Sequence, residues 1–334
     1  MKKYRYLSTM FAMDIVVLAY YVIEKITDSK RIIKEHKQFL ESVDCKGRIY
    51  IGPQGINAQL SIARSDLEKY LEFLKMDPIF NSADLKAHAD SSHRFAKLTI
   101  KYREQIVALD LDVDFSKRGE YISPEEFEKK LDQRDENTIL IDVRNNYESE
   151  VGYFEGALKP DRKTFREFIE YADQLATNTE NKKEKTVLMY CTGGIRCEFY
   201  SPLMKERGFD KVYQLKGGVI GYGLSQGAKH WRGKLFVFDD RLVVPISSDN
   251  EEVISHCKLC NASTDLFYNC ANMDCNSLFL SCKKCAIAHK GCCQTTCEGA
   301  PRVREMDKEN VRPQPFRKLP FEKKQEMSKI LSHL

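Results

Sequence analysis

Two short apolar runs, 138–143 and 186–190, constrain the fold most, because neither alternates polar and apolar residues. A strand that is covered on both faces has this pattern, as parallel strands in α/β proteins do. Helical patterns lie between and after the runs, and 212–215 is expected to make another short strand. The pattern therefore predicts a doubly wound α/β unit, in which ligands bind beyond the carboxyl ends of the strands.

A cysteine loop follows the second run directly, since 190–197 reads Tyr-Cys-Thr-Gly-Gly-Ile-Arg-Cys. Cys191 therefore lies at the carboxyl end of a strand, and the glycines after it allow the backbone to curl into an anion-binding nest. The nest residues are Thr192, Gly193, Gly194 and Ile195. The N-terminus of the helix expected from residue 198 and the charge of Arg196 both favour a thiolate. We therefore expect Cys191 to be a nucleophile that can carry sulfur as a persulfide, rather than a buried structural thiol.

A second cysteine, Cys197, lies six positions after Cys191. It could resolve a persulfide or a sulfenic acid on Cys191 by forming a disulfide. It could equally be a small apolar residue that fills space at the start of the helix. The sequence leaves both interpretations open.

The pattern Cys-x-x-Gly-x-Arg after a strand resembles the active loop of the rhodanese superfamily. Other matching segments occur in the same order, with Tyr153 where a histidine is frequent in that superfamily. They are Asp142-Val143-Arg144, Glu148, Gly152, Gly156-Ala157 and Lys216-Gly217-Gly218. The resemblance implies a rhodanese domain over 121–225, with Asp142 and Arg144 in supporting positions.

The first part of the chain, 13–115, alternates strand-like and helix-like patterns. Strands are expected at 16–23, within 47–62 around the turn 52–55, at 85–89 and at 95–108; helices are expected at 28–42 and 65–76. Asp28 or Ser29 should begin the first helix, and Ser65 with Glu68 should form a capping box at the second. The order β-α-β-β-α-β predicts a ferredoxin-like α+β sandwich, with an unspecific α/β domain as the alternative.

An apolar run at 11–23 follows Lys2 and Lys3 and superficially resembles a secretion signal. Asp14 interrupts it, no small-x-small cleavage site follows, and it is too short for a membrane-spanning helix. A buried strand is therefore the favoured interpretation, and we expect a soluble cytoplasmic protein with no membrane partner.

Nine of the twelve cysteines lie between Cys257 and Cys297. In an intracellular protein such a cluster favours metal binding over disulfides. Two pairs have the two-residue spacing of tetrahedral zinc sites; they are Cys257/Cys260 and Cys282/Cys285. A second, interleaved site is expected from Cys270, Cys275, Cys292 or Cys293, and Cys297, which leaves one cysteine over.

This module spans roughly forty residues with few large apolar side chains, so it needs a cross-link to fold. We expect one or two structural zinc ions, with disulfides or a mixture as the alternative. His256 and His289 are possible substitute ligands. The module and the strand expected near 235–241 occupy 226–300.

The last segment, 301–334, is rich in proline and charge, with nine Lys and Arg against five Asp and Glu. The net charge of the whole chain is only +4, so it does not by itself indicate nucleic acid. A basic tail can lie along phosphates, or it can be a solvated terminus.

Taken together, the chain resembles the rhodanese-related tRNA uridine hydroxylases of bacteria, apart from its first dozen residues and the tail after about Arg304. Beyond the loop, Gly291-Cys292-Cys293 and four longer segments carry the resemblance. They are 55–57 (Gly-Ile-Asn), 144–152 (Arg-Asn-x-Tyr-Glu-Ser-Glu-Val-Gly), 164–167 (Thr-Phe-Arg-Glu) and 238–241 (Phe-Asp-Asp-Arg). The resemblance implies hydroxylation of the tRNA wobble uridine to 5-hydroxyuridine, with molecular oxygen as co-substrate and tRNA as partner.

The catalytic residues that we expect are Cys191, Arg196 and Cys197. The sequence shows no flavin fingerprint, no haem attachment motif and no evident two-histidine-one-carboxylate iron site,. Cys191 would either add to the uracil ring or form an oxidised sulfur species that delivers oxygen. Two alternatives remain, a sulfurtransferase that carries a Cys191 persulfide and a non-catalytic RNA-binding or scaffold protein. The sequence does not indicate an oligomeric state.

Overall fold

The computed structural model describes residues 13–107, 113–161, 167–248, 250–307 and 309–314. These residues form two compact units. The first unit contains the described residues up to Asn146, Phe154–His230 and Val237–Leu242. The second contains Tyr147–Tyr153, Trp231–Phe236 and the described residues from Val243 onward. Among all of them, no helix has both the length and the apolar character that crossing a lipid bilayer requires.

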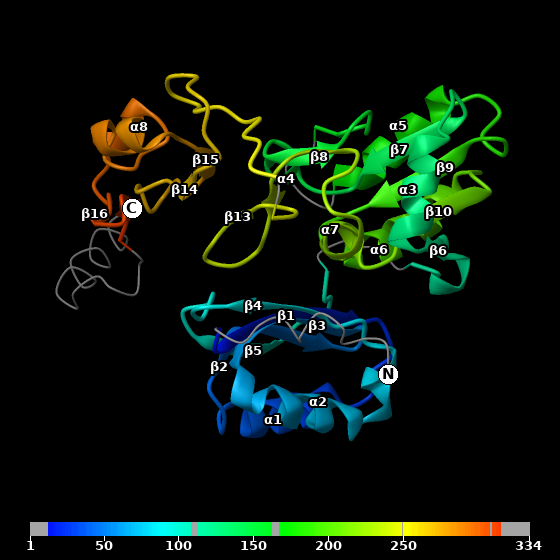
Figure 1. Cartoon of the computed structure of the whole chain (residues 1–334), viewed down its shortest axis with the longest axis horizontal. Coiled ribbons are helices and arrows are strands. Elements are labelled where there is room, and N and C mark those ends of the chain that lie inside the picture. Colours follow the sequence, from blue (N-terminus) through cyan, green and yellow to red (C-terminus); the bar gives the residue numbers. More distant parts are fainter. Residues whose placement is uncertain (1–12, 108–112, 162–166, 249, 308, 315–334) are drawn as a thin grey trace. The chain divides into compact units, whose positions relative to one another are not determined.

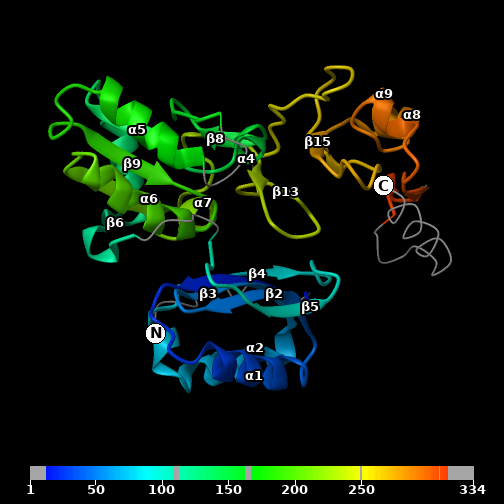
Figure 2. The same ribbon diagram turned by 180° about the vertical axis from the view of Figure 1, so that it is seen from behind.

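The first unit begins with a five-stranded sheet that has the order β4-β1-β3-β2-β5. Its strands are β1 (Ile15–Val22), β2 (Cys45–Gly52), β3 (Gly55–Ala63), β4 (Lys86–Asp90) and β5 (Leu98–Tyr102). The first four are antiparallel neighbours and β5 runs parallel to β2. Helices α1 (Ser29–Leu40) and α2 (Arg64–Lys75) cover one face of this sheet, as Figures 1 and 2 show, and η2 (Pro78–Ser82) follows α2. The expected ferredoxin-like arrangement is confirmed.

Alternation along β1 separates a buried face of this sheet from an open one. Leu18 and Tyr20 are 1% and 2% exposed and pack in the core with the helices. Side chains of successive residues in a strand point to opposite faces, so the neighbours of Leu18 and Tyr20 point away from this core. Ala19 and Tyr21 therefore lie on the open face, where the register pairs Tyr21 with Asn57 of β3.

Asp28 caps α1 as expected, since its side chain accepts a hydrogen bond from the Arg31 amide. The capping box predicted from Ser65 and Glu68 is wrong, because α2 begins at Arg64 with Ala63 as its N-cap and no side-chain cap bond. Strand β3 runs directly into α2, and the Arg64 amide donates to the carbonyl of Asp14 at 2.7 Å. A tertiary backbone contact thus satisfies a donor that a capping side chain usually serves.

The second sheet of this unit is parallel and has the order β6-β10-β9-β7. Its strands are β6 (Glu120–Ile122), β7 (Thr138–Asp142), β9 (Thr186–Tyr190) and β10 (Lys211–Leu215). The helices of this unit around it are η3 (Phe115–Lys117), α3 (Pro124–Asp132), α5 (Phe168–Asn178), α6 (Ile195–Glu206) and α7 (Gly218–Gln226). Helix α4 (Asn146–Ser149) follows β7 in sequence and belongs to the second unit from Tyr147 onward. Val187, Leu188 and Met189 are all fully buried, so β9 is covered on both faces as its apolar run predicts. Helix α6 begins three residues earlier than expected, which places Cys197 within its first turn.

The turn 216–218 holds the loop that follows β9. The amide of Val219 donates to the carbonyl of Cys191 at 2.9 Å, and the amide of Ile220 donates to that of Thr192 at 3.1 Å. Gly218 has a φ of +62°, and a Cβ there would lie 2.5 Å from the Cys191 carbonyl oxygen. Only glycine therefore allows this close approach of two backbone segments.

The second unit consists of short elements. Its strands are β8 (Gly152–Phe154), whose last residue belongs to the first unit, β11 (Trp231–Gly233), β12 (Leu235–Phe236), β13 (Val243–Val244), β14 (Phe267–Asn269), β15 (Leu278–Leu280), β16 (Met306–Asp307) and β17 (Arg312–Pro313). Its helices include α8 (Lys283–Ala288) and α9 (Thr295–Glu298). The part of the predicted basic tail from 315 to 334, the start of the apolar run at 11–12 and the matched residues 164–166 lie outside the described residues.

The strand expected over 235–241 is only two residues long. It ends because the Asp239 side chain accepts a hydrogen bond from the Arg241 amide at 3.0 Å and turns the chain,. Arg241 then lies 3.4 Å from the Asp90 carboxylate of β4. The 238–241 segment is therefore a turn that attaches to the edge of the first sheet.

Replacing Gly218 by alanine should lower the free energy of unfolding by about 1–3 kcal/mol, because the new Cβ meets two carbonyls and an amide in a left-handed conformation,. Urea denaturation followed by circular dichroism measures this loss. Gly221→Ala is the matched control, since Gly221 lies in the same helix without a positive φ. Equal stability of the two variants would contradict the inference that the close contact of Gly218 with the cysteine loop stabilises the fold.

Candidate functional site

Cys191 is fully buried at the end of β9, within a ring of backbone amides. The Gly194 amide donates to the Cys191 sulfur at 3.1 Å, and the amides of Arg196 and Cys197 donate to it as well. Gly194 reaches the required geometry with a φ of +101°. The loop and the start of α6 therefore surround the sulfur with the amides of Gly194, Arg196 and Cys197.

This nest stabilises the thiolate of Cys191. Burial by itself would raise the pKa of the thiol, but the Cys197 hydrogen bond, the Arg196 charge and the two amides lower it to about 5. A thiol with a pKa of about 5 is almost wholly ionised at neutral pH. The site thus holds a sulfur nucleophile in its reactive form.

Two contacts hold the Arg196 guanidinium beside the cysteine loop. Its guanidinium donates to the Thr192 hydroxyl at 3.3 Å and lies 5.8 Å from the centre of the Phe238 ring. The side chain is held on both sides, so its positive charge stays near the Cys191 sulfur. Of the other nest residues, Gly193 has open space where a Cβ would be, and Ile195 begins α6.

Asp142 and Arg144 form a buried ion pair with an oxygen–nitrogen distance of 2.6 Å. The Tyr190 hydroxyl donates to the same Asp142 carboxylate at 2.9 Å. Tyr190 directly precedes Cys191, so the pair holds the end of β9 in place. The described contacts of the Asp142–Arg144 pair therefore support the loop and do not include the Cys191 sulfur.

Cys197 is fully buried and its thiol is hydrogen-bonded to the Cys191 sulfur. Burial, that bond and the negative charge of Cys191 together raise the pKa of Cys197 well above its ordinary value. The two cysteines therefore form an unequal pair, with one thiolate and one thiol.

The open face of the first sheet supplies residues that motif reading missed. Lys86 pairs in register with Ala19 of β1, and Gln59 and Arg48 continue the same row across β3 and β2. The next row holds Tyr21, Asn57 and Tyr50. Alternation in β1 and β3 could have predicted that these side chains share one face, but not which site they approach.

A cavity of about 290 Å³ lies within the first unit where this open face meets the nest. Its volume is near the lower end of the range of small-molecule sites, about 300–1,000 Å³. The sheet contributes Ala19, Tyr20, Tyr21, Arg48, Tyr50, Asn57, Ala58, Gln59 and Lys86 to its lining; other segments contribute Ile106, Val107, Asn145, Thr192, Gly193, Ile195, Arg196, Ile220 and Phe238. Cationic, aromatic and carboxamide groups thus surround the entrance to the cysteine loop.

Glu198 is a second buried group that sequence reasoning missed. Its carboxylate accepts hydrogen bonds from Tyr21 at 2.8 Å and from Tyr121, and it lies 3.2 Å from the Arg118 guanidinium. Burial raises the pKa of Glu198 despite these partners. Tyr21 also packs against the loop, because a Cβ on Gly194 would lie 2.9 Å from its hydroxyl.

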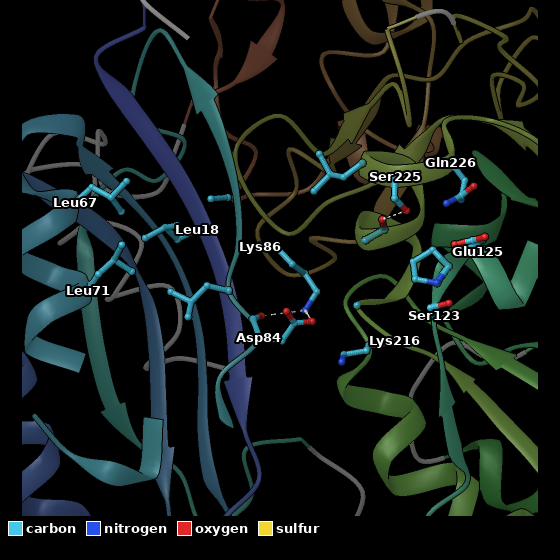
Figure 3. Close-up of a pocket in the computed structure, with 16 residues that line it drawn as sticks. Leu18, Leu67, Leu71, Asp84, Lys86, Ser123, Glu125, Lys216, Ser225 and Gln226 are labelled. Atoms are coloured by element: carbon cyan, nitrogen blue, oxygen red, sulfur yellow. Dashed lines mark hydrogen bonds and ion pairs between the residues drawn. The ribbon is translucent and has the colours of Figure 1, made fainter. Parts of the chain in front are cut away.

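A larger cavity of about 410 Å³ lies beside Lys86 in the same unit. Figure 3 shows Asp84 and Lys86 on one of its walls and Lys216, Ser123 and Glu125 on the other. Lys86 lines both cavities and is nearly buried, with its ammonium 5.4 Å from the centre of the Tyr21 ring. Burial lowers the pKa of Lys86, and the charges of Asp84 and Cys191 act against that shift.

The second unit brings eight cysteines together in two groups of four. The first group is Cys257, Cys260, Cys282 and Cys285; the second is Cys270, Cys275, Cys293 and Cys297. Within each group all sulfurs lie within 4.8 Å of one another. The Cys260–Cys282 and Cys275–Cys293 sulfur separations are 3.7 and 3.6 Å. Zinc–sulfur bonds of about 2.3 Å in a tetrahedron require sulfurs roughly 3.8 Å apart, so both groups fit zinc.

Of the two adjacent cysteines, Cys293 joins the second group and Cys292 does not. Cys292 is fully buried in the small core of the module. His256 and His289 are outside both groups, and His289 lies 2.7 Å from the Glu298 carboxylate instead. Spacing alone left the choice between Cys292 and Cys293 open because it does not fix which side chain faces the other three.

Family models match three consecutive parts of the chain. A UPF0176 acylphosphatase like domain matches 15–106, a rhodanese-like domain matches 123–223, and a rhodanase C-terminal domain matches 232–298. Among solved structures, a rhodanese-like domain from Anabaena shares 20% identity, with a TM-score of 0.28, over 41% of this chain and 92% of that chain. A structural likeness at that level adds nothing to the assignment.

Curated relatives match almost the full length. A tRNA uridine(34) hydroxylase of Protochlamydia amoebophila is 49% identical over 302 residues, which is 90% of this chain and 93% of that protein. Proteins of the same name from Chlamydia trachomatis serovar D and Chlamydia felis are each 48% identical, over 90% of this chain and 91% and 92% of their own lengths. With this identity and coverage, the chain belongs to the tRNA uridine(34) hydroxylase family.

Proposed function

We propose that this protein hydroxylates carbon 5 of the wobble uridine of tRNA, with molecular oxygen as co-substrate and Cys191 as the nucleophile. Its relatives are named for the hydroxylation of uridine 34. The observation that carries the proposal is a buried thiolate held by three amides beside a polar cavity of about 290 Å³. With tRNA as the substrate, we expect the reaction to take place in the cytoplasm.

The cavity has the groups that a uracil base requires. Uracil offers one N–H donor between two carbonyl acceptors, and the carboxamides of Asn57 and Gln59 can both donate and accept,. Tyr21 and Tyr50 lie on the same sheet face, and aromatic residues on such faces stack with unpaired RNA bases,. Arg48, Lys86 and Arg196 add positive charge that suits the phosphates on either side of the base,.

Cys191 would start the reaction by adding to carbon 6 of the base. The sulfur–carbon bond forms while the π electrons of the carbon 5–carbon 6 double bond move toward carbon 5 and the carbonyl at position 4. The resulting enolate makes carbon 5 electron-rich, so it can combine with oxygen. Because Cys191 is fully buried, the Thr192–Gly193 edge of the loop must shift when the base enters.

A rhodanese-like sulfurtransferase remains the second candidate, because the same nest would stabilise the anionic persulfide of Cys191. The two activities differ in product. Sulfur transfer from thiosulfate to cyanide gives thiocyanate, whereas hydroxylation adds one oxygen atom to tRNA.

The eight grouped cysteines are proposed to bind two structural zinc ions. The module has a small core that includes Tyr268, Phe279 and several of the cysteines themselves. Four thiolates at each centre would supply the cross-links that so small a core lacks.

The substitution Cys191→Ser should abolish 5-hydroxyuridine formation, because a serine hydroxyl is not ionised in this nest at neutral pH. Mass spectrometry of nucleosides from tRNA treated with each purified variant measures the product. Cys45→Ala is the control, since Cys45 is buried in the core of the first sheet. Normal hydroxylation by the serine variant would refute nucleophilic catalysis. Thiocyanate production by the wild type without any 5-hydroxyuridine would favour the sulfurtransferase.

Gln59→Ala and Asn57→Ala should each lower kcat/KM by about 10- to 100-fold, as expected when a buried polar partner of the base is lost. Steady-state kinetics with an unmodified anticodon stem-loop measure the effect. Gln133→Ala provides the matched control, because Gln133 is an exposed glutamine outside the cavity. Unchanged kinetics in both variants would mean that the base binds elsewhere.

Metal analysis of the purified protein should give two zinc ions per chain. Cys293→Ala should reduce this to one, while Cys292→Ala, one residue away, should retain both because Cys292 lies outside the two groups. Loss of zinc from the Cys292 variant alone would show that the ligand set is misassigned. A wild-type protein without zinc and with oxidised cysteines would favour disulfides.

A further inference from the structure

We propose that Cys191 and Cys197 together supply the two electrons that each hydroxylation consumes, and that they end each turnover as a disulfide. This inference rests on the proposed function, specifically on the use of molecular oxygen. It assigns a redox role to Cys197, which the uracil addition does not involve.

The requirement for two electrons follows from the atoms of the reaction. One oxygen atom of O₂ enters the base at carbon 5, and if the other leaves as water, two electrons and two protons must be added. Two thiols provide them: uridine, O₂ and two thiols give 5-hydroxyuridine, one disulfide and one water. This equation balances in atoms and charge without a further reductant in the same turnover.

The second thiol, that of Cys197, lies beside Cys191, as disulfide formation requires. Cys197 contacts the Cys191 sulfur through both its thiol and its backbone amide. It is fully buried in the first turn of α6, where it is in hydrogen-bond contact with Cys191. A disulfide requires sulfurs about 2.05 Å apart, so the two hydrogen-bonded sulfurs must move toward each other when the bond forms,.

The order of bond changes follows from these positions. After O₂ has added to carbon 5, loss of the carbon 5 proton and of Cys191 from carbon 6 gives a 5-hydroperoxy base and restores the thiolate. The Cys191 sulfur then attacks the outer oxygen, the O–O bond breaks, and 5-hydroxyuridine and a Cys191 sulfenic acid result. The Cys197 sulfur attacks that sulfenic acid, which forms the disulfide and releases the oxygen as water.

The unequal charges of the pair prevent Cys197 from acting too early. While Cys191 is a thiolate, its charge and hydrogen bond keep the neighbouring thiol protonated. A sulfenic acid is neutral, so this repulsion ends once Cys191 has been oxidised. Cys197 thus becomes a better nucleophile at the step that requires it, and it also protects the sulfenic acid from further oxidation.

A single-turnover experiment tests the proposal. The reduced full-length protein is freed of external thiols without oxygen, mixed with excess anticodon stem-loop and exposed to air. We expect about one 5-hydroxyuridine per chain, together with a 191–197 disulfide found by peptide mapping after alkylation. Adding dithiothreitol should restore continuous turnover.

The variant Cys197→Ser should form no 191–197 disulfide, and dimedone should trap a sulfenic acid on Cys191, because a serine hydroxyl cannot close the disulfide. Cys45→Ala should behave as the wild type does, because Cys45 is remote from the loop in the first core. If Cys197→Ser fails to fold, as judged by circular dichroism, peptide mapping of the wild type still decides the question.

Many turnovers without external thiol, or release of one hydrogen peroxide per product with both thiols still free, would overturn the dithiol role while leaving the hydroxylase assignment intact. Absence of 5-hydroxyuridine even with dithiothreitol would instead defeat the proposed function.

Discussion

The site depends on the close approach of two backbone segments at the carboxyl ends of β9 and β10. Gly218 lies where any side chain would meet the Cys191 carbonyl, and the amides after it hold that carbonyl and its neighbour. These hydrogen bonds occupy the loop carbonyls, while the Gly194 amide of the loop donates to the Cys191 sulfur. A thiolate in a fully buried position is stable only because these donors replace the water that it has lost.

Local patterns predicted the parts of the fold that are determined locally. The apolar run of β9 and the glycines after it indicated both the parallel strand and the nest, because both depend on neighbouring residues. The start of α2 was missed because the donor at Arg64 is satisfied by Asp14, which lies fifty residues earlier in the chain. Likewise, nothing near Tyr21 or Lys86 in the sequence indicates that their partners include Glu198 and the Cys191 thiolate.

The first sheet shows how one fold can provide a core on one face and a site on the other. Its buried face needs only apolar side chains of suitable size, such as Leu18 and Tyr20. The open face is free of that requirement and carries amides, cations and tyrosines at alternate positions. A doubly wound domain carries the Cys191 thiolate, and the sheet carries the polar and aromatic groups on which the proposed binding of the base rests. Neither domain alone contains both sets of residues.

If the protein uses molecular oxygen as proposed, twelve equally reactive cysteines would be a liability. Eight of them lie in two groups with the geometry of zinc thiolate centres, where a bound metal would hold each sulfur,. Cys45 and Cys292 are buried in separate cores. Cys191 and Cys197 lie outside both groups. Cys191 has a pKa of about 5 and is hydrogen-bonded to the Cys197 thiol. In the proposed reaction, oxidation is therefore directed to the Cys191–Cys197 pair, which can form a disulfide that a thiol reductant reduces again.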